Sequence, residues 1–92
     1  MHEIRFAEGY EKRAIKFFKK HRDLWGKYKK TIELLEANPT HPSLRVHKLQ
    51  GKIHPYALVS INMQYRIIID FIVVDEVIIL IDIGSHDDVY RK

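Results

Sequence analysis

A small set of polar residues in the second half of the chain has the side-chain types that phosphate chemistry needs. Arg66 lies inside an apolar, strand-like run, between Tyr65 and Ile67. A guanidinium can hold a phosphate through paired hydrogen bonds. A structural arginine at the same position would instead pair with an acid on a neighbouring strand, such as Asp82 or Asp70. The sequence leaves both interpretations of Arg66 open.

Two further candidates follow the last apolar run, in the segment IGSHDDVYRK. His86 comes two residues after Gly84, and a histidine in such a loop can give or take a proton near neutral pH. Tyr90 lies four residues further on and could stack on a nucleic-acid base. The alternatives are a surface histidine beside two aspartates and a tyrosine that closes the core.

A third group of candidates surrounds a predicted turn near the middle of the chain. His47 and Lys48 come just before this turn, and Arg45 and Lys52 flank it. Their positive charges could form a basic rim around a phosphate-binding site. Equally, they could be exposed residues at the edge of a sheet, where charge discourages aggregation.

Other kinds of site are absent from the sequence. The chain has no cysteine, and its six histidines form no HExxH or H-x₃-H pair, so no metal is predicted. A phosphate-binding glycine loop of the Walker or GxGxxG type is missing, so no cofactor is predicted. The Gly84-Ser85-His86 triplet is not a nucleophile elbow.

The elements that must position the candidates follow from the hydrophobic periodicity. Ile4 and Phe6 alternate with polar neighbours, which predicts a short first strand. Helical spacing predicts one helix from Tyr10 to about His21. It predicts a second from Asp23, the expected N-cap, to the Asn38-Pro39 stop. Beyond this stop the period changes to 2, and strands are expected at His47–Leu49, Tyr56–Asn62, Tyr65–Ile72 and Glu76–Ile83.

These elements predict one α+β domain over residues 1–92, in the order β-α-α-β-β-β. The two helices are expected to form a hairpin, because only one or two residues separate them. The short links after residue 60 predict an antiparallel sheet of three to four strands. The last two strands are apolar on both sides, so they should be covered at least in part on both faces.

Charge and hydropathy limit the partners and the compartment. Residues 1–52 hold 13 Lys and Arg against 6 Asp and Glu, whereas residues 53–92 hold 3 against 6. A basic half attracts polyanions, and RNA is the expected partner, although solvation of two exposed helices would also explain the charge. The N-terminal residues are charged where a signal peptide is apolar, and no run is long enough to span a bilayer. A soluble, cytoplasmic protein is therefore expected.

Together these features resemble the RelE/ParE toxin superfamily, in particular its RelE-, YoeB- and YafQ-like branch. The resemblance is carried by the HKLQG segment, the YRIII strand and the IGSHDDVY ending, at residues 47–51, 65–69 and 83–90. The two basic helices and the order of elements agree with it as well. The resemblance therefore covers essentially the whole chain.

The resemblance implies the toxin of a type II toxin–antitoxin pair, a ribosome-dependent endoribonuclease that cuts mRNA in the ribosomal A site. In the implied reaction a ribose 2′-OH attacks the adjacent phosphorus and leaves a 2′,3′-cyclic phosphate, without a metal. This needs a proton acceptor, a proton donor for the leaving 5′-oxygen, and positive charge for the phosphorane. The implied partners are mRNA, ribosomal RNA and an acidic, partly disordered antitoxin.

The same resemblance implies roles for individual residues. Arg66 would neutralise the phosphate, His86 would be a general acid or base, and His47 would be a second acid–base group. Tyr90 would stack on a base or orient the scissile nucleotide. Flanking phosphates would be held by three basic residues, Arg45, Lys48 and Lys52.

The chain also departs from the family pattern. Ser60 and Gln64 stand about where YafQ-like members have a His and an Asp, and no Glu lies between Glu36 and Glu76, where YoeB-like members have a candidate base. The general base is therefore left open. Two other functions remain: a ParE-like inhibitor of DNA gyrase, and an inactive scaffold that only binds an antitoxin or the ribosome.

Overall fold

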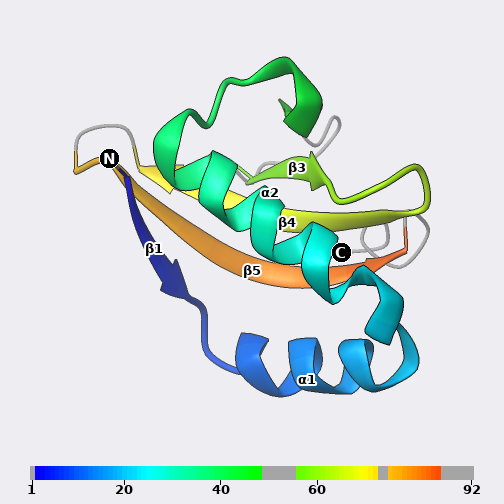
Figure 1. Cartoon of the computed structure of the whole chain (residues 1–92). Coiled ribbons are helices and arrows are strands. Elements are labelled where there is room, and N and C mark those ends of the chain that lie inside the picture. The colour runs from blue at the N-terminus through cyan, green and yellow to red at the C-terminus, as the bar shows by residue number, and fades with distance from the viewer. Residues whose placement is uncertain (1, 49–55, 73–74, 86–92) are drawn as a thin grey trace.

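A computed structural model describes residues 2–48, 56–72 and 75–85 of the chain (Figure 1). The N-terminal part holds β1 (Glu3–Phe6), α1 (Tyr10–Lys20), the 3₁₀ turn η1 (Arg22–Leu24), α2 (Trp25–Ala37) and the 3₁₀ turn η2 (Pro42–Leu44). The remaining strands are β2 (His47–Lys48), β3 (Tyr56–Ser60), β4 (Tyr65–Ile72) and β5 (Val77–Ser85).

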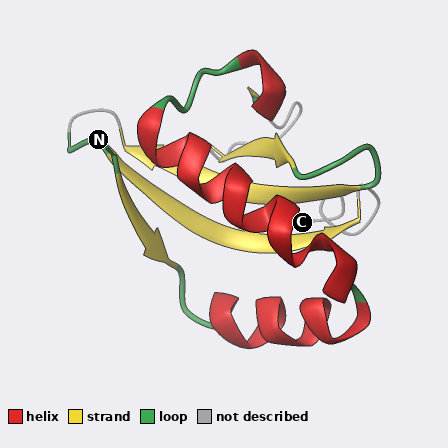
Figure 2. Cartoon of the chain, in the orientation of Figure 1, coloured by secondary structure: helices red, strands yellow, loops and turns green. Residues whose placement is uncertain are grey.

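The strands form one mixed sheet in the order β1-β5-β4-β3-β2 (Figure 2). The pairs β2–β3, β3–β4 and β4–β5 are antiparallel, which confirms the hairpin prediction. β1 adds a strand that runs parallel to β5, with Ile4 opposite Ile78 and Phe6 opposite Leu80. Parallel neighbours need a long crossover between them. Here the helices and the other strands separate β1 from β5 in sequence, so hairpin spacing could not have shown this pairing.

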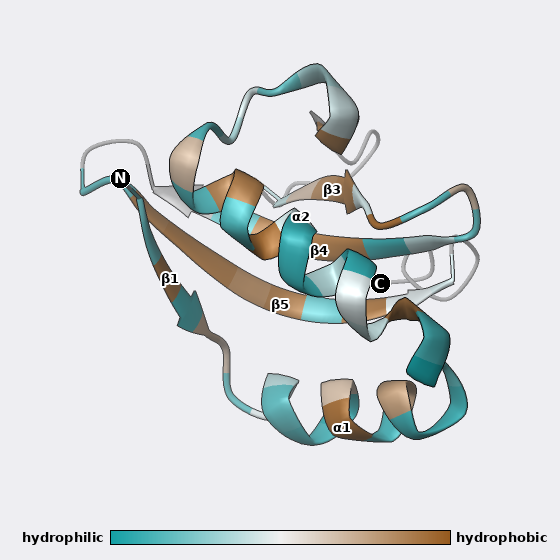
Figure 3. Cartoon of the chain, in the orientation of Figure 1, coloured by the Kyte–Doolittle hydropathy of each residue, from teal (hydrophilic) through white to brown (hydrophobic). Residues whose placement is uncertain are grey.

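Both long helices lie against one face of the sheet (Figure 1). The main core joins Tyr10 and Leu35 of the helices to Val59, Ile67 and Ile78 of the sheet. Figure 3 shows that β5 is apolar along most of its length, whereas α1 mixes apolar and polar residues. No helix within the described residues is long and apolar enough to cross a membrane.

The opposite face of the sheet carries a second, smaller apolar cluster. Leu58 of β3 and Ile68 of β4 are buried there, with Tyr56 and Ile81 packed against them. Since Ile67 of β4 is buried on the helix face, β4 is covered on both of its faces, as its continuous apolar run predicts.

Several predicted boundaries, including both ends of the last strand, differ from the structure by one or two residues, and two of these differences have a visible cause. Asp23 is not the N-cap of the second helix: it lies inside η1, and Leu24 precedes α2 without a side-chain cap. The reason is that Leu24 is buried, which draws the chain into a tight turn. Strand β3 ends at Ser60 rather than Asn62, because Asn62 Oδ1 accepts the backbone N–H groups of Gln64 and Tyr65, both at 2.9 Å, and so closes the turn.

A buried pair of tyrosines joins the two helices. The hydroxyls of Tyr10 and Tyr28 are 2.9 Å apart. Burial raises the pKa of Tyr10 far above its usual range, and the neighbouring Tyr28 adds to the effect. Burial also raises the pKa of Tyr28, against a lowering contribution from its bond to Tyr10. The fold therefore favours the neutral phenols.

We expect alkali to weaken the fold through this pair. The folded pKa lies above the unfolded value of about 10, so the stabilisation is complete below about pH 10 and is lost as the pH rises above it. Tyr10→Phe should reduce stability by about 1 kcal/mol at neutral pH and make the decline at high pH shallower. Urea denaturation at about pH 8 and about pH 11 measures both effects. An equally steep decline in the variant would contradict this account.

Candidate functional site

Arg66 lies at the start of β4 and projects from the face of the sheet that the helices do not cover. In β4 the side chains alternate, and Ile67 and Ile69 belong to the helix-side core. Arg66 stands opposite Ser60 of β3 and opposite Gly84 of β5. The guanidinium therefore has a hydroxyl residue on one side and a glycine, without a side chain, on the other.

The guanidinium of Arg66 is anchored at one of its nitrogens. Its Nη1 donates to the carbonyl of Asn62 and, at 3.2 Å, to the carbonyl of Tyr65. The hydroxyl of Ser60 donates to the same Asn62 carbonyl at 2.9 Å. Nε and Nη2 of Arg66 make no hydrogen bond to any residue that the structure describes. They keep three N–H donors for a ligand, while the turn fixes the orientation of the group.

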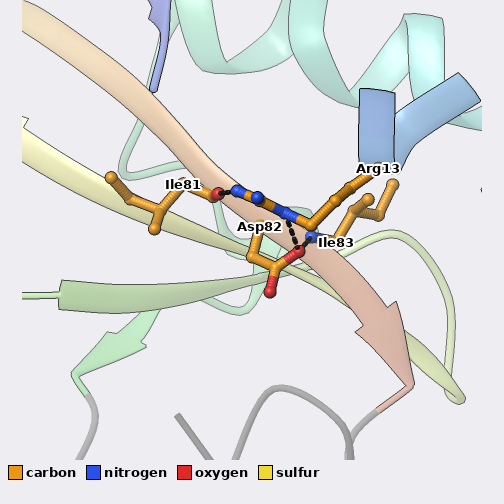
Figure 4. Close-up of polar contacts among 4 residues, drawn as sticks. All are labelled: Arg13, Ile81, Asp82 and Ile83. Carbon is orange, nitrogen blue, oxygen red and sulfur yellow. Dashed lines mark hydrogen bonds and ion pairs between the residues drawn. The ribbon is translucent and has the colours of Figure 1, made fainter. Parts of the chain in front are cut away.

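The structure also places the two aspartates that were proposed as partners of Arg66 in the structural interpretation. Asp82, one proposed partner, instead accepts from Nε of Arg13 at 3.0 Å (Figure 4). Asp70 stands opposite Tyr56 and Ile79 rather than Arg66. Among residues 2–48, 56–72 and 75–85, Arg66 has no ion pair, so the structural interpretation is wrong for both aspartates there. An arginine charge without a carboxylate partner suits an anionic ligand.

Arg45, a predicted phosphate ligand, reaches the same turn as Arg66. It follows η2 in a left-handed conformation with φ 49°. Its Nη1 lies 3.7 Å from Sδ of Met63. The turn between β3 and β4 therefore brings two arginines together that are 21 positions apart in the sequence.

The remaining candidates are placed only in part. His47 and Lys48 form β2, an edge strand, opposite Leu58 and Ala57 of β3. His86, Tyr90 and Lys52 lie outside the described residues, so their predicted roles are untested. In the sequence, His86 follows Gly84, the register partner of Arg66, by two positions.

A cavity of about 280 Å³, which no sequence pattern indicated, lies beside the β3–β4 turn. Its polar lining comes from α2, η2 and the end of β3. The residues with polar or sulfur side chains there are Lys27, Ser43, Arg45, Ser60, Asn62 and Met63. No sequence pattern distinguished Lys27 from the other basic residues of the two helices. Only tertiary packing places Lys27, among these residues, at the cavity.

A second, larger hollow lies among β1, α1 and α2, with a volume of about 580 Å³ and an almost wholly apolar wall. Phe6, Ile15 and Trp25 contribute to it while remaining 51%, 60% and 48% exposed. The charged residues Glu11, Lys19 and Arg22 also line it. Soluble proteins seldom leave several large apolar side chains together in water unless a partner covers them.

The described residues contain no cluster of three His, Asp or Glu side chains that could hold a metal ion. The polar groups that do converge are cationic or neutral, and they lie near the β3–β4 turn. Such groups bind anionic oxygen rather than metal ions.

Comparison with known proteins places this fold among bacterial toxins. No protein-family model matches the chain, and no curated protein matches its sequence. YafQ from E. coli superposes with a TM-score of 0.77 at 18% identity, over 98% of this chain and 99% of that one. A chain of the E. coli DinJ–YafQ toxin–antitoxin complex gives 0.77 at 21%, over 97% of both chains. The YoeB/ParE toxin from Agrobacterium tumefaciens gives 0.72 at 13%, over 91% of this chain and 98% of that one.

The chain therefore has the fold of the RelE/ParE toxin superfamily, over nearly its whole length. The resemblance carried by the sequence motifs is confirmed at the level of the fold. Function does not follow from a shared fold, and it has to be argued from the site.

Proposed function

We propose that this protein is the toxin of a type II toxin–antitoxin pair and cleaves mRNA in the ribosomal A site. The observation that supports this best is the anchored guanidinium of Arg66, which keeps three N–H donors and has no carboxylate partner in the described part of the chain. This is the arrangement that a phosphorane needs. Its fixed donors require little reorganisation when negative charge develops on the phosphate oxygens.

The proposed reaction is an attack of the ribose 2′-oxygen on the adjacent phosphorus. A base removes the 2′-OH proton, the bond from O2′ to phosphorus forms, and the bond from phosphorus to O5′ breaks. An acid protonates the leaving O5′, and the products are a 2′,3′-cyclic phosphate and a free 5′-hydroxyl. Arg66 would bind the non-bridging oxygens, and His86 and His47 would exchange the protons. Tyr90 would stack on a neighbouring base.

The direct test uses purified protein and programmed ribosomes that carry an end-labelled message. We expect cleavage at the decoding site and a 2′,3′-cyclic phosphate at the new 3′ end. An intact message together with stalled gyrase–DNA complexes would show that the gyrase-inhibitor alternative is the correct one. An intact message without an effect on gyrase would favour the inactive scaffold.

The proposed protein partner is an acidic antitoxin that covers the apolar hollow between the helices. Phe6, Ile15 and Trp25 offer an apolar surface, and the cations of Lys19 and Arg22 lie beside it. Lys29 adds a third charge, with Nζ 5.8 Å from the centre of the Trp25 ring. These three cations outnumber the carboxylate of Glu11, which also lines the hollow. An amphipathic segment with acidic flanks would therefore match this surface in both polarity and charge.

Binding of the antitoxin should depend on Ile15. We expect Ile15→Asp to weaken binding of the cognate antitoxin by about a hundredfold, because the carboxylate would be buried at an apolar contact. Trp25 is the only tryptophan, so its fluorescence reports occupation of the hollow directly. Val46→Asp, at another exposed apolar position, is the control. Equal loss in both variants would place the partner elsewhere.

A further inference from the structure

We propose that Met63 is an oxidation site and that its sulfoxide captures the guanidinium of Arg45. The oxidant would be a peroxide. The consequence, weaker binding of RNA, rests on the proposed function. The change would be reversible, because reductases return methionine sulfoxide to methionine. The protein would therefore lose affinity for RNA under oxidising conditions and regain it afterwards.

The β3–β4 turn holds Met63 out in water. Met63 is 75% exposed, the highest value among the exposed large apolar residues that the structure describes. The preceding residue, Asn62, fixes the turn, since its Oδ1 accepts the N–H groups of Gln64 and Tyr65 at 2.9 Å and its carbonyl accepts from Arg66. These bonds keep the side chain of Met63 from folding back onto the core, so small oxidants can reach it.

The sulfur of Met63 already faces a strong hydrogen-bond donor. Nη1 of Arg45 lies 3.7 Å from Sδ. A thioether is a weak acceptor, so this contact holds the guanidinium only loosely. The backbone of Arg45 is fixed, because its N–H donates to the carbonyl of Pro42 at 3.1 Å and its φ of 49° ends η2 in the left-handed region. A change at the sulfur therefore acts on the side chain of Arg45 and not on its backbone.

Oxidation would convert the weak contact into a strong one. The sulfur gives a lone pair to one peroxide oxygen, the O–O bond breaks, and the other oxygen leaves as water with the proton of the first. The sulfur is oxidised and the peroxide is reduced. The resulting sulfoxide is polar, and its oxygen can accept a charge-assisted hydrogen bond from the guanidinium.

The captured arginine is one for which the resemblance to RelE-like toxins implies a role in holding a flanking phosphate. The sulfoxide oxygen would compete with that phosphate for the same N–H donors. It would also present a partial negative charge to the RNA backbone beside the turn that anchors Arg66. Both effects lower the affinity for RNA, and neither removes a group that takes part in the proposed bond changes.

The test treats the full chain and its Met63→Leu variant with hydrogen peroxide, and mass spectrometry of peptides locates the added oxygen. Leucine keeps an apolar side chain of similar volume but cannot be oxidised in this way. Met1 is the only other methionine and is present in both proteins. A difference between the two treated proteins therefore reports on Met63.

We expect oxidation of the wild type to weaken binding of a short labelled RNA about tenfold, as for loss of one hydrogen bond to a charged group. Every ribose of this RNA is 2′-O-methylated, so that it cannot be cut. Treated Met63→Leu should bind as tightly as the untreated protein. Methionine sulfoxide reductases for both epimers should restore the oxidised wild type. In Arg45→Gly, oxidation should no longer change the affinity.

The side-chain Nε–H resonance of Arg45 tests the capture without RNA. Its disappearance in Arg45→Gly assigns it, and glycine suits the φ of 49° at this position. We expect the resonance to shift when the wild type is oxidised and to stay in place in treated Met63→Leu.

Three results would overturn the proposal: an Arg45 resonance that does not move, equal loss of RNA affinity in treated Met63→Leu, or equal loss in oxidised Arg45→Gly. If the untreated protein bound no RNA, the proposed function would fail. The Arg45 resonance would then still decide whether the sulfoxide captures the guanidinium.

Discussion

Arg66→Lys is expected to lower the rate of message cleavage on ribosomes by a factor of about 10² to 10³, the usual effect of removing one donor that stabilises a transition-state oxyanion. The variant keeps the positive charge. It loses the planar fork that lets Nη1 hold the turn while Nε and Nη2 remain available for a phosphate. A lysine has a single nitrogen and cannot do both.

The effect should appear in the rate of the chemical step rather than in binding. Single-turnover cleavage with ribosomes in excess separates the two. Arg5→Lys is the matched control, because Arg5 is an exposed strand arginine in β1, an edge strand that is not adjacent to β4. A rate within twofold of the wild type, in an Arg66→Lys protein that is still folded, would remove Arg66 from the proposed chemistry.

Arg13→Ala is expected to destabilise the fold by about 2 kcal/mol, the second large effect. The side chain of Asp82 is only 8% exposed, and Arg13 is its ion-pair partner at 3.0 Å. Removal of the arginine leaves the buried carboxylate without its neutralising charge. For a fully buried pair this typically lowers the free energy of unfolding by about 3–5 kcal/mol. Because the Arg13 side chain is 44% exposed, water can replace part of the interaction, and the smaller figure applies.

Arg13 also holds α1 to the sheet. Its Nη2 donates to the carbonyl of Ile81 in β5 at 2.7 Å (Figure 4). Ile81 directly follows Leu80, the last residue of β5 that pairs with β1. Gly9 makes this contact possible, because its φ of 81° lets the chain turn from β1 into α1. Gly9 also leaves room for the guanidinium of Arg13, whose Nη1 lies 2.8 Å from the place that a Cβ of residue 9 would occupy.

Urea denaturation of Arg13→Ala and Arg5→Ala gives a matched comparison of two arginine–carboxylate pairs. Arg5 pairs with Glu3 on the surface, where both side chains are more than half exposed, so its loss should leave the midpoint unchanged within error. The double variant Arg13→Ala/Asp82→Ala should recover part of the loss, because it removes the buried charge as well. If the midpoints of Arg13→Ala and Arg5→Ala shift equally, the pair with Asp82 has no special structural role.

The sequence by itself determined the type and order of the elements, and its charge distribution led to the prediction of an anionic partner. The helical spacing of apolar residues and the later change to alternation depend on local geometry, since a side chain must face the core once per turn or once every second residue. These patterns predicted the strand over Tyr65–Ile72 with the bounds that the structure has, and the others to within a few residues. The basic first half, with Lys27 in it, likewise indicated an anionic partner.

Only the tertiary structure decided which charges meet. The register of β4 against β5 shifts between Ile68 and Ile69, so that Asp82 stands opposite Ile68 while Leu80 stands opposite Ile69. Such irregularities re-aim side chains. Here Asp82 pairs with Arg13 and not with Arg66. The parallel pairing of β1, the convergence of Arg45 and Arg66 on one turn, and the cavity with Lys27 are equally long-range. Each depends on contacts between residues far apart in the chain, and no local pattern of residue types encodes such contacts.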